Sequence, residues 1–165
     1  MDELEIEQSE PVLLTQAGMD RLKAELSRLT IHKRAEIAER IRDSKDHGEF
    51  SEDNNELDEV KVEQAIVESR ISELKTILSG AGVLSDDDIS TDHVGLGSLV
   101  TVTDTQRGFD FTVRIVASVE ADADLDLISE ESPMGQALDG ARVGETVTFE
   151  APAGTINYRV DKIAK

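Results

Sequence analysis

Hydrophobic positions divide the chain into two parts that have different periods. In the first part, apolar residues recur at intervals of three and four from Met19 to Leu29, and the same spacing resumes at Ile37 and Ile41 after a drift of one residue. This spacing is typical of a helix that buries one face, and it predicts a helix from about residue 16 to residue 46. Because such a helix is about 46 Å long, it cannot lie inside a small globular domain.

A second helical pattern follows and has the period of a coiled coil. Its positions alternate in steps of three and four and include one polar member: Leu57, Val60, Gln64, Val67, Ile71, Leu74 and Leu78. This heptad seam predicts a helix that packs along a partner. Gly48 allows a break after the first helix, Ser51 can cap the second, and Gly80 ends it. Since two long helices with so short a link run antiparallel, we expect a hairpin. An ordinary helical bundle is the alternative, although no third helix of matching length exists.

The pattern changes to alternation after an Asp-rich segment that ends at residue 97. Five runs with this pattern are typical of β-strands: 99–102, 109–115, 125–127, 147–149 and 156–160. Between the third and fourth runs, residues 133–138 are typical of a short helix, with Pro133 at its start and Gly140 as the signal that ends it. The sequence therefore predicts an α+β protein with a long N-terminal antiparallel coiled-coil hairpin followed by an antiparallel β domain with one short helix. The expected divisions are a segment at 1–14, the coiled coil at 15–80 with its tip at 46–59, a linker at 81–97 and the β domain at 98–165.

Composition and charge exclude several classes of function. The 165 residues include 36 acidic and 17 basic ones, so the formal net charge is -19. General nucleic-acid binding depends on Lys and Arg and is excluded by this balance. There is no Cys, hence no disulfide and no thiolate metal site. The acidic N-terminus does not have the pattern of a secretory signal, and no run of 18 apolar residues occurs, so we expect a cytoplasmic protein that does not contact a membrane.

Acidic residues concentrate at the predicted tip of the hairpin. The stretch from Asp46 to Val60 contains seven acids and no Lys or Arg. A solvated acidic tip without function is one interpretation. The other is metal binding, because carboxylates are the oxygen ligands that Mg²⁺ prefers, usually one or two from a protein. Side chains at the end of a rod diverge into water, so this tip would complete a metal site in a partner and not hold a cofactor of its own.

Three segments of the sequence resemble those of one known family. They are Leu14-Thr15-Gln16-Ala17-Gly18 at the start of the first helix, His47-Gly48-Glu49-Phe50-Ser51-Glu52 at the tip, and Ser132-Pro133-Met134-Gly135-Gln136-Ala137-Leu138 in the second domain. On these motifs the chain resembles the bacterial Gre transcript-cleavage factors, as a divergent member with an altered tip. The resemblance implies an FKBP-like C-terminal domain that docks at the rim of the RNA polymerase secondary channel through a loop corresponding to Glu131, Ser132 and Pro133.

The resemblance also gives the tip a role. In cleavage-competent members, two tip acids help to hold the second Mg²⁺ of the polymerase, which then hydrolyses the RNA 3′ end, as two-metal chemistry requires. By position these acids correspond to Glu49 and Glu52, with Asp53 as a further metal-facing acid. The resemblance therefore implies a monomeric protein without intrinsic catalysis, which uses the Mg²⁺ of the polymerase and meets the nascent RNA 3′ end only indirectly.

The tip departs from the cleavage pattern of that family. Glu49 replaces an Asp, Asp53 replaces an Asn, and Glu56 replaces a Tyr. Because Glu is one methylene longer than Asp, the tip would place Mg²⁺ unproductively. We therefore expect a factor that occupies the channel and inhibits or modulates elongation, with stimulation of transcript cleavage as the alternative. Two further alternatives are a prolyl isomerase, for which the second domain has few aromatic residues, and a structural coiled-coil adaptor, which leaves the acidic tip unexplained.

Overall fold

The computed structural model describes residues 11–48 and 55–165; the side chains of residues 47 and 48 are outside this description. The chain divides into two compact units. Ala17–Ala81 forms one, and Gly82–Lys165 forms the other together with residues 11–16. Among the helices of the described residues, none combines the length and apolar character that a membrane span needs.

The first helix of the hairpin is confirmed, and it contains one irregular turn. α1 spans Gln16–Arg28, a π-helical segment spans Leu29–Lys33, and α2 spans Arg34–Gly48. The buried residues Leu22, Leu29 and Ile37 are separated by seven and then eight positions. A π-helical turn takes up one extra residue, so Ile37 returns to the buried face. The one-residue drift in the hydrophobic pattern is this insertion.

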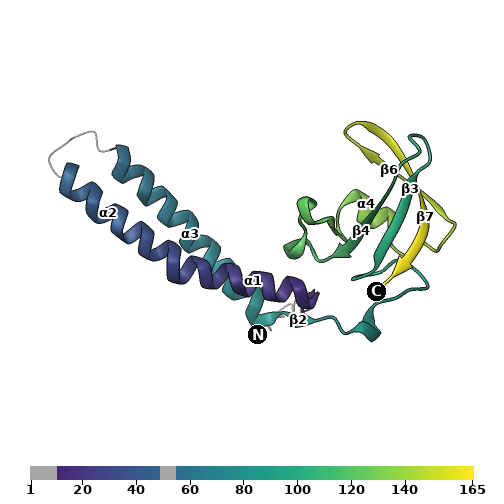
Figure 1. The fold of residues 1–165 in the computed structure, drawn as a ribbon, viewed down its shortest axis with the longest axis horizontal. Coiled ribbons are helices and arrows are strands. Elements are labelled where there is room, and N and C mark those ends of the chain that lie inside the picture. The colour runs from purple at the N-terminus through teal and green to yellow at the C-terminus, as the bar shows by residue number, and fades with distance from the viewer. Residues whose placement is uncertain (1–10, 49–54) are drawn as a thin grey trace, which may run out of the picture. The chain divides into compact units, whose positions relative to one another are not determined.

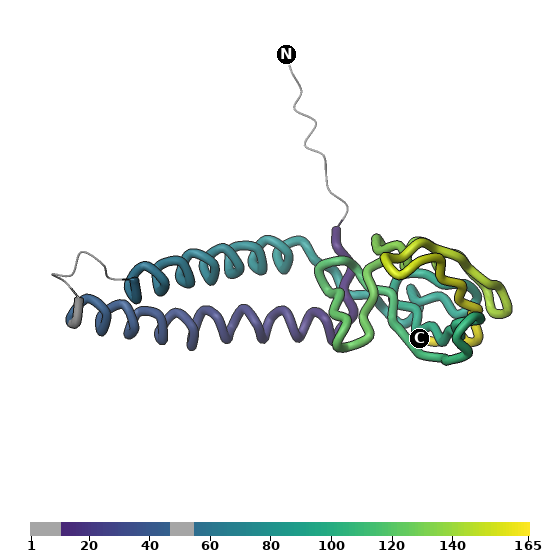
Figure 2. The backbone as a smooth tube through the Cα atoms, turned by 90° about the horizontal axis from the view of Figure 1, so that it is seen from above, coloured from purple at the N-terminus to yellow at the C-terminus, as the bar shows by residue number. Residues whose placement is uncertain are grey.

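α3 spans Asn55–Gly80 and packs antiparallel beside α2 (Figures 1 and 2). At 26 residues it is about 39 Å long. Its buried side chains are Val60, Val67, Ile71 and Leu74, which are four of the predicted seam positions. The polar seam position, Gln64, is exposed. The hairpin therefore has an apolar seam, as the heptad pattern predicts.

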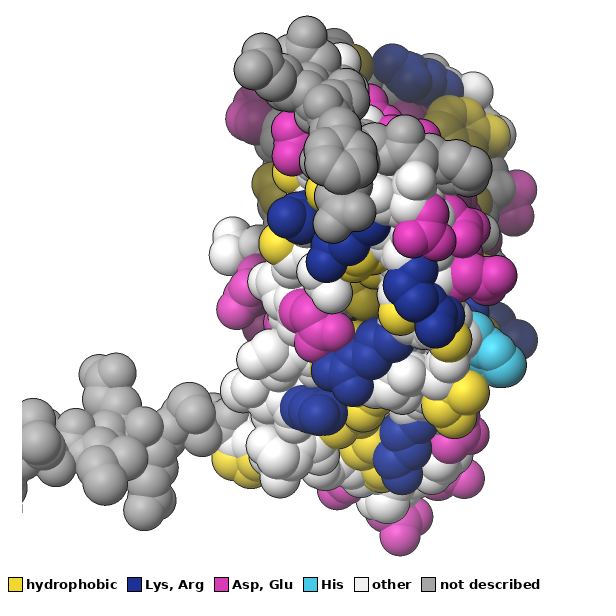
Figure 3. All heavy atoms as spheres, turned by 90° about the vertical axis from the view of Figure 1, so that its left-hand side faces the viewer, with side chains coloured by type: hydrophobic (Ala, Val, Ile, Leu, Met, Phe, Trp, Pro, Cys, Tyr) yellow, Lys and Arg dark blue, Asp and Glu magenta, His cyan; other side chains and the backbone are white. Residues whose placement is uncertain are grey.

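Ion pairs join the two helices along this seam, and we call them the shaft pairs. They are Arg34 with Glu68 (2.8 Å), Arg70 with Glu25 (2.8 Å), and Glu63 with both Lys33 (2.8 Å) and Arg40 (2.7 Å). On the face drawn in Figure 3, basic and acidic side chains lie next to one another. Each shaft pair links α3 to a residue between Glu25 and Arg40, so the pairs reinforce one alignment of the helices.

The C-terminal unit contains a five-stranded sheet. Its strands are β3 (Leu99–Asp104), β4 (Asp110–Val116), β5 (Leu127–Ser129), β6 (Thr146–Ala151) and β7 (Gly154–Ala164). They lie in the order β5-β4-β3-β7-β6, and all neighbours are antiparallel except β4 and β5 (Figure 1). The third predicted strand begins later than expected, because Ala123–Leu125 forms a 3-10 turn before it.

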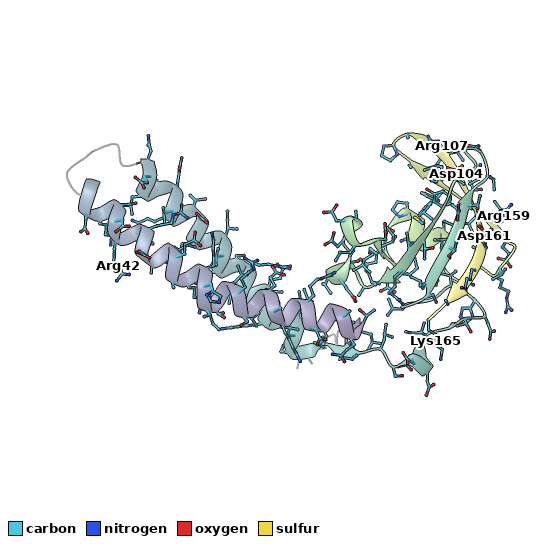
Figure 4. All side chains as sticks on the ribbon, in the orientation of Figure 1. Arg42, Asp104, Arg107, Arg159, Asp161 and Lys165 are labelled. Atoms are coloured by element: carbon cyan, nitrogen blue, oxygen red, sulfur yellow. The ribbon has the colours of Figure 1, made fainter. Side chains whose placement is uncertain are left out.

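Side chains from the sheet and from one helix form the core of this unit. α4 spans Pro133–Leu138, the bounds that the sequence predicts. Its Leu138 is fully buried in a cluster with residues that include Val100, Val102 and Val160. The turn after β3 is closed by the buried Asp104, whose Oδ1 accepts the N–H groups of Gln106 and Arg107, both at 2.9 Å. Figure 4 labels Asp104 and Arg107 at this turn, and Arg159 and Asp161 on β7.

Two short strands bring the chain segments on either side of the hairpin together. β1 (Leu13–Leu14) pairs in parallel with β2 (Gly82–Val83), and Leu14 is fully buried. The expected linker at 81–97 contains β2, the 3-10 turn Asp86–Asp88 and the fully buried Val94, which belongs to the core of the C-terminal unit. Residues 11–15, before α1, and the residues from Gly82 onward are thus both structural parts of the C-terminal unit.

Candidate functional site

The loop between β5 and α4 contains the residues that the resemblance assigns to docking, and we call residues 129–133 the docking loop. Ser132 holds the loop from within: its Oγ donates to the carbonyl oxygen of Ser129 at 2.6 Å and accepts the N–H of Gly135 at 3.0 Å. Ser132 is therefore the N-cap of α4, and Pro133 follows at the first helical position, where a missing N–H costs nothing. Glu131 and Pro133 are exposed, whereas Ser132 is partly buried.

Gly135 fixes how closely the helix approaches the loop. A Cβ atom at this position would lie 2.1 Å from the carbonyl oxygen of Ser129 and 3.0 Å from Cα of Glu130. Both of these atoms belong to the backbone, so no side-chain rotation could relieve the clash. Only glycine allows this contact, and the contact sets the shape of the docking loop.

Residues of the docking loop line two different hollows of the C-terminal unit. An apolar hollow of about 470 Å³ is lined by Ser132, Pro133 and Met134 together with Phe149 and other residues of the unit. A second hollow of about 550 Å³ is lined by Glu130 and Glu131, by residues 117–119 and by residues 11–13. The loop therefore presents apolar atoms toward one hollow and acidic side chains toward the other, which suits a protein partner with both apolar and basic groups.

A 3-10 turn at Ser118–Glu120 lies next to the docking loop and contains residues that the sequence did not single out. The Ser118 hydroxyl donates to Oε2 of Glu131 at 2.8 Å. Glu120 is only 1% exposed, and its carboxylate accepts the N–H of Thr15 at 3.0 Å and the Thr15 hydroxyl. In a chain this rich in acids and serines, no spacing or neighbouring motif distinguishes these two side chains, so only the fold reveals them.

The acids of the shaft pairs differ from the acids near the tip of the hairpin. The pKa values of Glu25, Glu63 and Glu68 are lowered because Arg70, Lys33 with Arg40, and Arg34 respectively donate hydrogen bonds to them. By contrast, Asp46, Glu56, Asp58 and Glu59 near the tip are exposed and form no ion pair with another described residue. The acids of the shaft pairs thus link the two helices, whereas these four acids near the tip do not.

The predicted tip residues themselves, Glu49, Glu52 and Asp53, lie outside the residues that the structure describes. They belong to the six residues that connect Gly48, the last residue of α2, with Asn55, the first of α3. Within residues 11–48 and 55–165, no group of three or more acidic or His side chains is placed to hold a metal ion. Near this end Figure 4 labels Arg42, which is exposed on α2.

Sequence models of two protein families together match most of the chain. Residues 12–83 match the model described as transcription elongation factor, N-terminal, and residues 89–165 match transcription elongation factor, GreA/GreB, C-term. The chain belongs to the GreA/GreB family of transcription elongation factors. The first match covers α1 to α3 with β1 and β2, and the second covers the five-stranded sheet with the docking loop, so both parts of the chain belong to the family.

Relatives of this GreA/GreB family member match it over nearly their whole length. The protein named transcription elongation factor GreA of Caldanaerobacter subterraneus subsp. tengcongensis is 43% identical over 157 residues, which are 95% of this chain and 99% of that protein. The GreA of Syntrophomonas wolfei subsp. wolfei is 44% identical over 154 residues, covering 93% and 96%. The crystal structure of GreA factor homolog 1 (Gfh1) of Thermus thermophilus is 33% identical, with a TM-score of 0.44 and coverage of 94% and 99%.

Membership of the GreA/GreB family confirms the resemblance seen in the sequence and decides between the broad alternatives. Gre factors are elongation factors that act through RNA polymerase, and neither family model is that of an enzyme. This membership favours the elongation-factor interpretation over the prolyl isomerase and adaptor alternatives. The aromatic residues also pack on one another: the ring of Tyr158, 8% exposed, lies 5.2 Å from that of Phe111 and 5.4 Å from that of Phe149, measured between ring centroids.

Proposed function

We propose that this Gre-family member binds at the rim of the RNA polymerase secondary channel through its docking loop and brings Glu49, Glu52 and Asp53 toward the active-centre Mg²⁺. The observation that carries this proposal is the difference between the two sets of acids on the hairpin. The acids of the shaft pairs are paired with bases, whereas Asp46, Glu56, Asp58 and Glu59 near the tip are exposed and form no ion pair among the described residues. Acids that do not stabilise the protein's own fold are available to a cation of the partner.

The docking loop supports binding of the polymerase through its shape. Its conformation is fixed in the free protein by Ser132 and Gly135, and Pro133 is exposed at the edge of an apolar hollow. Because little conformational freedom remains to be lost, such a loop binds at a low entropic cost. The net charge of -19 further favours a partner surface with basic groups.

The altered tip favours inhibition or modulation of elongation over transcript cleavage. Glu49 has one more methylene than the Asp of the cleavage pattern, and Asp53 adds an anion where that pattern has a neutral Asn. Two-metal hydrolysis needs the second ion aligned with the attacking and leaving oxygens. A tip that attracts Mg²⁺ without this alignment occupies the channel without promoting hydrolysis. Stimulated cleavage is the second candidate, supported by identities of 43% and 44% to proteins named GreA.

A backtracked elongation complex with end-labelled RNA separates these candidates. We expect this protein, with Mg²⁺ at neutral pH, to slow RNA extension without shortening the RNA. E49Q/E52Q should relieve the slowing while polymerase binding is kept. The charge-matched control E39Q/E145Q removes two exposed acids that have no ion pair among the described residues, and it should behave as the unaltered protein.

Each contrary outcome has a definite meaning. RNA shortening that depends on Glu49 and Glu52 would establish the cleavage factor. A full effect in E49Q/E52Q would remove the tip from the mechanism. E49D/D53N/E56Y restores the three altered positions of the cleavage pattern, so a gain of cleavage in this variant alone would identify misplaced Mg²⁺ as the cause of inhibition.

A further inference from the structure

A closed ring of hydrogen bonds holds the carboxylate of Glu131, although this residue is exposed. The backbone N–H of Glu131 donates to Oγ of Ser129 at 3.1 Å, the hydroxyls of Ser129 and Ser118 are 2.6 Å apart, and Ser118 donates to Oε2 of Glu131 at 2.8 Å. The ring joins the docking loop to the 3-10 turn at Ser118–Glu120, thirteen positions back along the chain. It starts and ends on the same residue.

The direction of every proton in this ring is determined by the ionised carboxylate. A carboxylate only accepts hydrogen bonds, so the single hydroxyl proton of Ser118 points to Glu131. Ser118 Oγ is then free to accept the proton of Ser129, and Ser129 Oγ accepts the N–H of Glu131. Each hydroxyl both donates and accepts, and hydrogen bonds in such a chain strengthen one another. The ring therefore fixes the orientation of the carboxylate as well as its position.

One face of this carboxylate remains available to a partner. Oε1 of Glu131 has no hydrogen-bond partner among the described residues, and Glu131 lines the hollow of about 550 Å³ together with Ser118 and Glu130. An exposed ion pair usually gains little, because two long side chains lose their freedom when they meet. That loss is smaller when one of the two is already ordered before binding.

We propose that Ser118 and Ser129 are positioning residues for polymerase binding: they orient the Glu131 carboxylate to receive a Lys or Arg side chain of RNA polymerase. This inference rests on the proposed docking role of the loop and names the chemistry of the partner group. The two serines do not touch the partner. They act through Glu131, so their contribution exists only while Glu131 carries its charge.

A double-mutant cycle tests this dependence. Binding of the full-length protein to RNA polymerase core enzyme is measured by fluorescence anisotropy at several KCl concentrations, for S118A, E131Q and S118A/E131Q. We expect S118A to weaken binding about two- to tenfold, the loss that corresponds to reordering one flexible side chain. E131Q should weaken binding and reduce its salt dependence. In the E131Q background, S118A should add nothing, because coupled residues are not additive.

Controls separate positioning from folding. S85A removes a serine hydroxyl that donates to the carboxylate of Asp88, also at 2.8 Å and in the same unit, and it should leave binding unchanged. S118T keeps a hydroxyl and should restore binding. The fluorescence of Tyr158, the one tyrosine of this chain without Trp, reports whether each variant is folded.

The outcomes distinguish failure of this inference from failure of the proposed docking. Equal losses from S118A with and without Glu131, or no loss from S118A while E131Q binds weakly, would overturn the positioning role and keep the docking loop. Unchanged affinity in both E131Q and P133A would overturn the docking loop itself, and the positioning role with it.

Discussion

Replacement of Glu120 by Ala tests how much the hydrogen bonds from Thr15 to this buried side chain contribute to the stability of the C-terminal unit. Glu120 is 1% exposed and accepts both the N–H and the hydroxyl of Thr15. Its removal leaves two donors without this acceptor, and each partly buried donor that loses its partner costs about 1–3 kcal/mol. The buried carboxylate itself carries a desolvation cost that the variant no longer has. We therefore expect a net loss of about 2–4 kcal/mol in the free energy of unfolding, which is in the lower part of the range obtained by adding the costs of the two donors.

Urea unfolding followed by tyrosine fluorescence measures this loss of stability in the C-terminal unit, to which Glu120 belongs. Tyr158 is the one tyrosine, and it lies in the core of the C-terminal unit, so its signal does not report on the hairpin. E120Q keeps one oxygen acceptor and should lose only about 1 kcal/mol. E145A removes an exposed acid of the same unit and should stay within about 0.5 kcal/mol of the unaltered protein. If E120A moves the transition no further than E145A does, the bonds to Thr15 contribute nothing to stability.

Three further predictions concern the hairpin and the docking loop. Leu74 is fully buried in the seam, so L74A should cost about 2–5 kcal/mol in unfolding followed by circular dichroism at 222 nm. The unfolding transition reported by Tyr158 fluorescence should not move. A shift of both signals together would contradict the expectation that the hairpin unfolds separately from the C-terminal unit. The acids of the shaft pairs have lowered pKa values, so the stability that these pairs give the hairpin is complete above the ordinary pKa near 4.5 and is lost as the pH falls through the lowered values. The stability of the hairpin should therefore fall on acidification below about pH 4.5. A flat stability profile from pH 6 to 3 would contradict this. G135A should abolish polymerase binding because its Cβ atom would clash with the carbonyl oxygen of Ser129. G95A should bind normally because a Cβ atom at Gly95 has open space. Equal affinities of the two variants for polymerase would mean that the shape of the docking loop does not matter for binding.

Secondary structure was predictable from the sequence wherever one periodic pattern of hydrophobic residues continued without interruption. The seam from Val60 to Leu74 and the bounds of α4 follow directly from heptad spacing and from Pro133 as a helix start. The drift between Leu29 and Ile37 was also visible in the sequence, but spacing alone does not say whether a bend, a break or an inserted residue causes it. The structure resolves this as a π-helical turn, with the Thr30 hydroxyl bonded to the carbonyl oxygen of Leu26 at 2.8 Å.

The candidate site was predictable only in part, for a physical reason. Glu131, Ser132 and Pro133 are adjacent in sequence, so a local motif identifies them together. Ser118 and Glu120 act across distances of 13 and 105 positions in the chain, and hydrogen bonds between such distant residues leave no periodicity. Alternation also does not reveal that the two residues of β1 pair with the two residues of β2, which lie far apart in the chain.

Opposite electrostatic arrangements at the docking loop and near the hairpin tip follow from the different partners proposed for them. A partner side chain such as Lys or Arg carries its own flexible stem, so affinity gains when the carboxylate that receives it is already ordered, as the ring around Glu131 orders it. A metal ion has no stem to order and instead demands ligands that can adjust to its coordination shell, so acids without a fixed partner suit it better. Neutralising the acids near the tip with added bases would therefore weaken an interaction with Mg²⁺, whereas loosening the ring would weaken binding to polymerase and leave the tip unchanged.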